Sequence, residues 1–197
     1  MENNYDNNYI VPIYKKINGN YEFWGSGFII EKYLISAAHV FDDEDTDFQV
    51  IFNNISVKLT NLIYREYRKG ENIRYDLQIF KLENANSPYA LFNGDYIWKE
   101  ELTLDGFNMN ENNADVIRSV ITVKISENAY EYNYGAKPIP LKNCFSLYPK
   151  SKPGNSGCPI IKDNVIYGMN ISQEGDADYM GSNAIRSDYI FSILSNI

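Results

Sequence analysis

The chain has 197 residues, which is enough for one domain with a buried core or for two small barrels that share a site, but not for a third unit. Its 26 acidic and 18 basic residues give a net charge of −8, which argues against a nucleic-acid or anionic-membrane surface. Residues 1–8 lack the basic and apolar regions of a secretory signal, and no later run is long enough to span a membrane. We therefore expect a soluble, cytoplasmic protein.

The first half has the pattern of short strands separated by turns. Asn18-Gly19-Asn20 is a strong hairpin signal, because Asn and Gly tolerate positive φ. Alternating apolar residues predict strands over residues 9–17, 21–30, 33–36, 48–52, 55–64 and 77–82. The segment 69–72 is expected to be a loop, and the turn-rich interval 83–99 is the expected boundary between the two halves.

The second half repeats this pattern and ends differently. Strands are predicted over residues 101–107, 116–125, 144–148, 158–161 and 165–172. Near the end of the chain Ile190, Ile193, Leu194 and Ile197 recur at helical spacing. This part of the sequence therefore predicts a second barrel followed by a short terminal helix.

The most informative stretch is Gly154-Asn155-Ser156-Gly157, which places a serine between glycines. Glycines let the backbone bend sharply and let a substrate carbonyl approach closely. The N–H groups of Gly154 and Ser156 could then point at one spot and bind a developing oxyanion. Taken alone, the same tetrapeptide is a common turn.

Two further residues complete the chemistry that a nucleophilic serine needs. The single histidine, His39, ends the phrase Ser36-Ala37-Ala38-His39, and Asp76 opens the strand-like run 76–82. His39 could take the proton from Ser156, and Asp76 could fix the imidazole tautomer and stabilise the imidazolium. A strand-opening aspartate can also be a turn residue, but no other acid in the first half precedes so well matched an apolar strand.

Four phrases together resemble the motifs of trypsin-like serine peptidases, in order and over nearly the whole chain: Gly25-Ser26-Gly27-Phe28-Ile29-Ile30, Ser36-Ala37-Ala38-His39, Asp76-Leu77-Gln78-Ile79 and Gly154-Asn155-Ser156-Gly157-Cys158-Pro159. They are most similar to the bacterial branch that includes the HtrA type. The resemblance implies an all-β, chymotrypsin-like fold of two six-stranded antiparallel β-barrels with a short C-terminal helix. It implies one peptidase domain over 1–197, with barrels over 1–90 and 91–186 and the helix over 187–197.

The implied activity is that of a serine endopeptidase, which hydrolyses protein or peptide substrates through His39, Asp76, Ser156 and an acyl-enzyme. The alternative is a peptide-binding or interaction module on an inactive or partner-gated peptidase fold, because fold does not fix function. A cytoplasmic peptidase endangers its own cell, so either narrow specificity or gating by a regulatory protein partner is expected. Digestive members of the family pair an aspartate before the serine with a newly cut N-terminus. That position is Asn155 here, so no such activation is expected.

The resemblance also places the floor of the substrate pocket at Lys150. If its ammonium points into the pocket, it would favour Glu or Asp before the scissile bond. If it instead reaches solvent, Ser151, Asn170 and Ser172 would line a small neutral pocket. The strand 165–172 would line the cleft and could pair with an extended substrate.

No cofactor or metal is expected. With one histidine and two cysteines, no usual zinc ligand set can be assembled, and the acidic run 42–47 is interpreted as a solvated loop. Cys144 and Cys158 exclude the multi-disulfide framework of secreted family members, although one bridge stays open. Cys158 is expected to act as a small buried apolar side chain.

Overall fold

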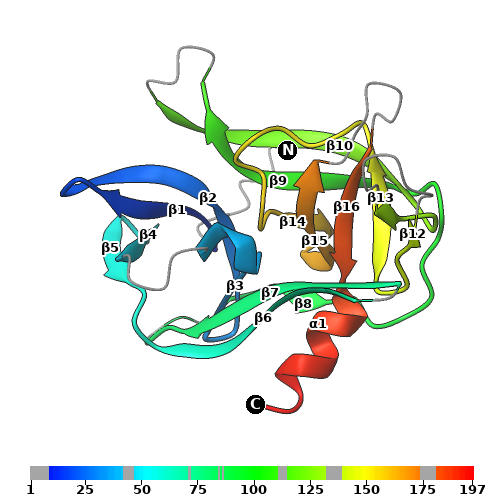
Figure 1. The fold of residues 1–197 in the computed structure, drawn as a ribbon, viewed down its shortest axis with the longest axis horizontal. Helices are drawn as coiled ribbons and strands as arrows, with labels where there is room; N and C mark the ends of the chain where they lie inside the picture. The colour runs from blue at the N-terminus through cyan, green and yellow to red at the C-terminus, as the bar shows by residue number, and fades with distance from the viewer. Residues whose placement is uncertain are drawn as a thin grey trace.

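The computed structural model describes residues 9–41, 47–70, 72–83, 85, 87–110, 115–131, 139–173 and 181–197. Strands dominate these ranges, with one 3-10 turn and one α-helix (Figure 1). The first half contains β1 (Ile10–Ile17), β2 (Asn20–Ile30), β3 (Tyr33–Ser36), η1 (Ala38–Phe41), β4 (Phe48–Phe52), β5 (Ile55–Lys58), β6 (Leu62–Gly70) and β7 (Ile73–Lys81). The rest contains β8 (Ala90–Leu91), β9 (Glu101–Met109), β10 (Val116–Ser126), β11 (Tyr130–Glu131), β12 (Ile139–Pro140), β13 (Cys144–Tyr148), β14 (Pro159–Lys162), β15 (Val165–Gln173), β16 (Ser182–Arg186) and α1 (Ser187–Leu194).

The first half is one curled antiparallel sheet in the order β5-β4-β1-β2-β3-β7-β6. The predicted hairpin between β1 and β2 is confirmed, and Asn18 and Gly19 both have positive φ, at 51° and 87°. These values are typical of the type I′ turns whose twist matches that of paired strands. Within the described ranges no pairing joins β5 to β6, so this sheet is a half-barrel.

The second half closes on itself. Its strands follow the order β14-β9-β10-β13-β16-β15, and an additional pairing of β14 with β15 completes a six-stranded barrel. The short β8 adds to β15 in parallel, and α1 follows directly from β16. The all-β class and the C-terminal helix are therefore confirmed, with the difference that the seven-stranded first sheet stays open.

Several strand boundaries differ from the sequence predictions. The expected strand 55–64 is two strands, β5 and β6. In the expected loop 69–72, Lys69 and Gly70 instead belong to β6, where Gly70 pairs with Ile73 of β7. Asp76 consequently lies in the middle of β7 rather than at its start. The β6–β7 hairpin is rich in charged and Tyr residues, so the alternation of apolar and polar residues that predicts a strand is not visible in its sequence. The strand β16 was not predicted, because Ser182-Asn183-Ala184 carries little apolar signal.

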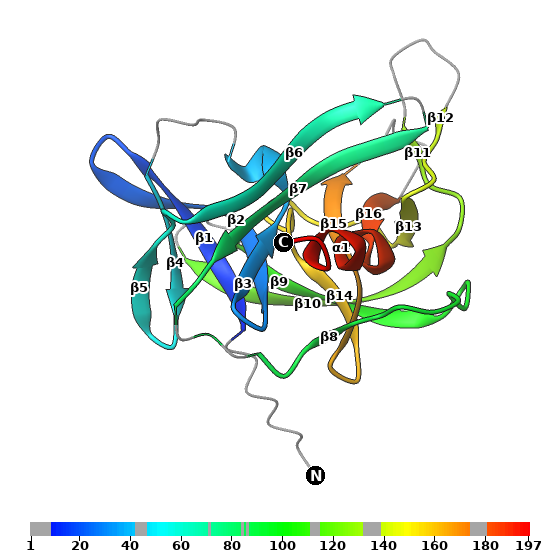
Figure 2. The same ribbon diagram turned by 90° about the horizontal axis from the view of Figure 1, so that it is seen from below.

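Two clusters of buried apolar side chains form the core. The second is the barrel interior, with Leu104, Val123, Ile125, Phe145 and Ile160 all fully buried. The first fills the half-barrel and continues into the second half through residues such as Met169, Ile185 and Ile190. This continuity fixes the two halves against each other, with α1 and the β6–β7 hairpin covering the junction (Figure 2).

No helix in the described part of the chain is long and apolar enough to cross a membrane.

Candidate active site

His39 lies in η1, directly after β3. Ala37 and Ala38 are fully buried beneath it, so the small residues of this phrase let the turn pack tightly on the core. The imidazole itself keeps 29% of its surface exposed. The ring is therefore held by the first half of the chain and still faces solvent.

Asp76 on β7 is fully buried and contacts His39 twice. Its Oδ2 lies 2.7 Å from His39 Nδ1, and its Oδ1 accepts the main-chain N–H of His39 at 3.0 Å. A carboxylate at Nδ1 places the ring proton there and leaves Nε2 as an acceptor. The two contacts together fix both the tautomer and the orientation of the ring.

Ser156 comes from the second half, and its Oγ lies 2.9 Å from His39 Nε2. The sharp bend at the serine depends on Gly157, which has a φ of 81°. A Cβ at position 157 would lie 2.0 Å from the carbonyl oxygen of Ser26 and 2.3 Å from Ser36 Oγ. No side chain fits there, so the packing of β2 and β3 requires this glycine.

Residues Lys152 to Asn155 form a β-turn immediately before the serine. The N–H of Asn155 donates to the carbonyl of Lys152 at 3.0 Å, and Gly154 has a φ of 89°. Proline at the second position and positive φ at the third define a type II turn. In the described part of the chain, the N–H groups of Gly154 and Ser156 make no hydrogen bond, so both are available to an oxyanion.

Arg74 is a site residue that sequence reasoning missed. Its side chain is 9% exposed, and Nη2 donates to Asp76 Oδ2 at 3.3 Å. Asn143 from the second half holds the main chain of Arg74, accepting from its N–H at 3.1 Å and donating to its carbonyl at 2.5 Å. Residues two apart on a strand share a face, so opposite charges at 74 and 76 were the available signal.

The predicted substrate-binding residues do not all lie together. Lys150 is exposed, whereas Ser151 and Asn170 are buried beside the serine loop. Asn170 donates from Nδ2 to the main-chain carbonyl of Asn155 at 2.9 Å, and the main-chain carbonyl of Asn170 accepts the N–H of Gly157. Ser172 belongs to β15, but its side chain lies outside the described part.

Ser182 joins this group without having been predicted. It is fully buried, and its Oγ lies 2.9 Å from that of Ser151 and accepts the N–H of Ser151 at 2.7 Å. Like the rest of β16, it gave no signal in the sequence. The interior beside the serine loop is thus lined by hydroxyls and amides.

The cysteines are not bridged to each other, and both are buried thiols. Burial raises the pKa of Cys158 to about 12, so this thiol is neutral at physiological pH. Gly106 leaves room for it, because a Cβ there would lie against Cys158 Sγ. Cys158 therefore packs as the small apolar side chain that the sequence suggested.

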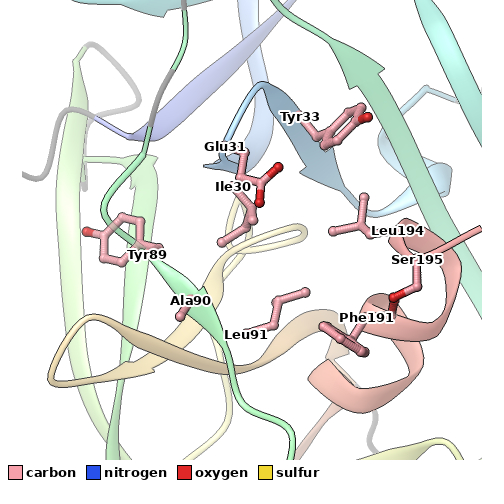
Figure 3. A pocket seen from close by; sticks show the side chains of 9 residues that line it. All are labelled: Ile30, Glu31, Tyr33, Tyr89, Ala90, Leu91, Phe191, Leu194 and Ser195. Atoms are coloured by element: carbon pink, nitrogen blue, oxygen red, sulfur yellow. The ribbon is translucent and has the colours of Figure 1, made fainter. Parts of the chain in front are cut away.

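One hollow adjoins the serine loop, and another lies away from it. One, of about 470 Å³, adjoins the oxyanion turn and is lined by Phe23, Trp24, Asn108, Met109, Asn110, Ile117, Lys152, Pro153 and Gly154. The other, of about 360 Å³, lies between the β2–β3 turn, β8 and α1, where Leu91, Phe191 and Leu194 surround it (Figure 3). Among the described residues, no group of three or more His, Cys, Asp or Glu side chains could hold a metal ion.

A two-unit β fold with an aspartate, a histidine and a serine in contact across its junction is the architecture of trypsin-like peptidases. A family model described as Trypsin matches residues 2–190, so the chain belongs to the trypsin family. No curated protein matches the chain.

Solved structures agree on the fold. The active form of the Rv3671c protease from M. tuberculosis superposes with a TM-score of 0.72 at 14% identity, covering 97% of this chain and 81% of that one. The MamO protease domain from Magnetospirillum magneticum gives 0.65 at 15% identity, with 95% and 96% covered. The scabies mite inactivated protease paralogue S-I1 gives 0.66 at 16% identity, with 96% and 93% covered. At these identities the likeness shows the fold alone.

Proposed function

We propose that this chain is a serine endopeptidase with His39, Asp76 and Ser156 as base, orienting acid and nucleophile. The observation that carries the proposal is the unbroken contact series from Asp76 through His39 to Ser156, with heavy-atom distances of 2.7 and 2.9 Å. The 2.9 Å distance lies within the range required for proton transfer between a nucleophile and its base, and the 2.7 Å distance is that of a hydrogen bond that orients the base. Residues 1–197 would act as one peptidase domain with its site at the junction of the halves.

Each step of the reaction follows from these contacts. Ser156 Oγ attacks the scissile carbonyl while its proton passes to His39 Nε2, and the buried Asp76 stabilises the imidazolium. The N–H groups of Gly154 and Ser156 bind the resulting oxyanion, a contribution of about 3 kcal/mol per donor. Collapse of the intermediate transfers the proton to the leaving amine and forms the acyl-enzyme. A water molecule, deprotonated by His39, then releases the acid and restores Ser156.

The substrate would be a protein or peptide, and we propose a neutral pocket for the residue before the scissile bond. The exposure of Lys150 supports the alternative in which its ammonium reaches solvent. Ser151, Asn170 and Ser182 would then supply a polar, uncharged lining. Small or polar uncharged side chains would be preferred over Lys, Arg, Asp and Glu. Ser172 stays a candidate for the same lining.

A second candidate function is peptide binding without turnover. The observation in its favour is that the fold is shared with a scabies mite protein whose name describes it as an inactivated protease paralogue. A regulatory protein that gates the cleft would be compatible with either function.

Digestion of a randomised peptide library separates these functions. The proposal predicts new peptide N-termini with the wild-type chain and none with Ser156→Ala, with uncharged residues enriched before the cut. Retention of peptides without any cleavage, equal for both chains, would support the binding module instead. Cleavage mainly after Lys or Arg would contradict the neutral pocket while leaving the peptidase proposal intact.

A further inference from the structure

Ser26 connects the first half of the molecule to both residues of the proposed oxyanion hole. It lies in β2 and is fully buried. Its Oγ donates to the carbonyl of Gly154 at 3.1 Å, and its main-chain N–H donates to the carbonyl of Ser156 at 2.9 Å. Its Oγ also accepts the N–H of Phe107 on β9 at 3.0 Å. One small side chain thus contacts the oxyanion turn and the barrel wall behind it.

Asn155 completes this junction from the other side. Its Nδ2 donates to the carbonyl of Phe107 at 3.1 Å, and its Oδ1 accepts the N–H of Lys152 at 2.9 Å. The pairing of β14 with β9 extends only over Leu104 and Thr103. Among the strands that the structure describes, none is paired with this edge of β9 at Phe107. The side chains of Ser26 and Asn155 satisfy both main-chain groups of Phe107 in place of a strand.

We propose that Ser26 is a positioning residue for the oxyanion hole, an inference that rests on the peptidase function proposed above. The peptide between Gly154 and Asn155 is held at both ends, through its N–H by Lys152 and through its carbonyl by Ser26. Conversion of the turn to type I would reverse the Pro153–Gly154 peptide and turn the Gly154 N–H away from the substrate. Ser26 favours the type II form by fixing the next peptide.

Because the space around Ser26 is tight, only a smaller residue can replace it without disturbing the junction. A Cβ at Gly157 would lie 2.0 Å from the Ser26 carbonyl oxygen, and one at Gly106 would lie 3.3 Å from Ser26 Oγ. A larger residue at position 26 would therefore disturb the whole junction. Ser26→Ala removes only the hydroxyl and leaves the Gly154 carbonyl and the Phe107 N–H without that partner.

The matched control is Ser187→Ala at the start of α1. Ser187 is equally buried, and its Oγ donates to the carbonyl of Phe92 and contacts the hydroxyl of Tyr96 at 2.9 Å. Its removal deletes comparable hydrogen bonds but touches no residue of the oxyanion turn. Any loss that comes only from a weakened fold should appear in both variants.

The test is acylation by p-nitrophenyl acetate, expressed per active site after titration with a fluorophosphonate. Counting sites removes the effect of unfolded protein from the rate. We expect Ser26→Ala to lower the maximal acylation rate per site by about 10- to 100-fold, with the concentration for half-maximal rate changed less than about twofold. Ser187→Ala should keep the wild-type rate per site even if its melting temperature falls.

Amide hydrogen exchange adds a readout that does not need turnover. Exchange at Phe107 and Asn155 should accelerate at least about tenfold in Ser26→Ala and stay unchanged in Ser187→Ala. A per-site rate within about twofold of wild type, or unchanged exchange at Phe107 and Asn155, would overturn this inference alone. A wild-type chain that is never acylated would contradict the proposed function itself, and with it this role of Ser26.

Discussion

The two sides of the site are stabilised by different kinds of interaction. On the side built by the first half, the fully buried Asp76 is surrounded by the imidazole of His39 and the guanidinium of Arg74. On the side built by the serine loop, neutral groups stabilise the site. The side chains of Ser26 and Asn170 donate hydrogen bonds to the main-chain carbonyls of Gly154 and Asn155, respectively.

This difference predicts how each side responds to change. A buried charge is costly once a partner is removed, so the Asp76 side should be sensitive in both stability and activity. A neutral hydrogen bond contributes about 1 kcal/mol, so the loop side should lose alignment before it loses stability.

The largest effects should come from the three residues in contact across the junction. Ser156→Ala and His39→Ala should each lower kcat/KM for a cleaved peptide by about 10⁴-fold or more, and Asp76→Asn nearly as much, because the three act as a unit. Circular dichroism should show an intact fold for Ser156→Ala and His39→Ala. Activity within about tenfold of wild type in any of the three would mean that its role is assigned wrongly.

Arg74→Met tests the charged side. It removes a cation that is only 9% exposed and leaves Asp76 buried with one charged partner fewer, so the free energy of unfolding should fall by about 3 kcal/mol. Urea denaturation measures this. Arg68→Met is the matched control, because Arg68 pairs with Glu66 while 66% exposed and should cost less than about 1 kcal/mol. Equal losses for the two variants would contradict the sensitivity predicted for the buried charges around Asp76.

The reactivity of Cys158 tests whether the interior beside the serine loop excludes water and ionised groups. Burial raises its pKa to about 12, whereas an unfolded thiol ionises near about 8.5. The folded chain should therefore resist alkylation of Cys158 by iodoacetamide at pH 8, and peptide mapping should show modification only after unfolding in urea. Above about pH 8.5 the unfolded state gains the ionised thiol first, so stability should fall as pH rises. Equal alkylation rates in folded and unfolded protein would contradict this environment.

The smallest expected effect is that of trimming the N-terminus. Asn155 is fully buried, and its neutral amide bonds to Phe107 and Lys152. Removal of residues 1–8 should therefore change the acylation rate per site by less than about twofold. An increase in this rate by orders of magnitude would show that the serine loop needs an ion pair with a newly formed N-terminus.

The contrast also separates what the sequence could predict from what it could not. His39 and Ser156 were predictable because glycine and small residues around them leave a local pattern. Arg74 was detectable in principle from its spacing to Asp76 on one strand. The role of Ser26 was not, because its partners Phe107 and Gly154 come from distant segments that meet only when the halves pack together. The open first sheet was hidden for the same reason, since closure depends on long-range pairing.

Labelling by a fluorophosphonate followed by peptide mapping is the most direct test of the proposed serine endopeptidase. The probe reacts only with a serine whose hydroxyl is activated and whose oxyanion can be bound. We expect one equivalent of label per chain, located on Ser156 and absent from His39→Ala. Failure to label the folded wild-type chain, or label at another residue, would contradict it.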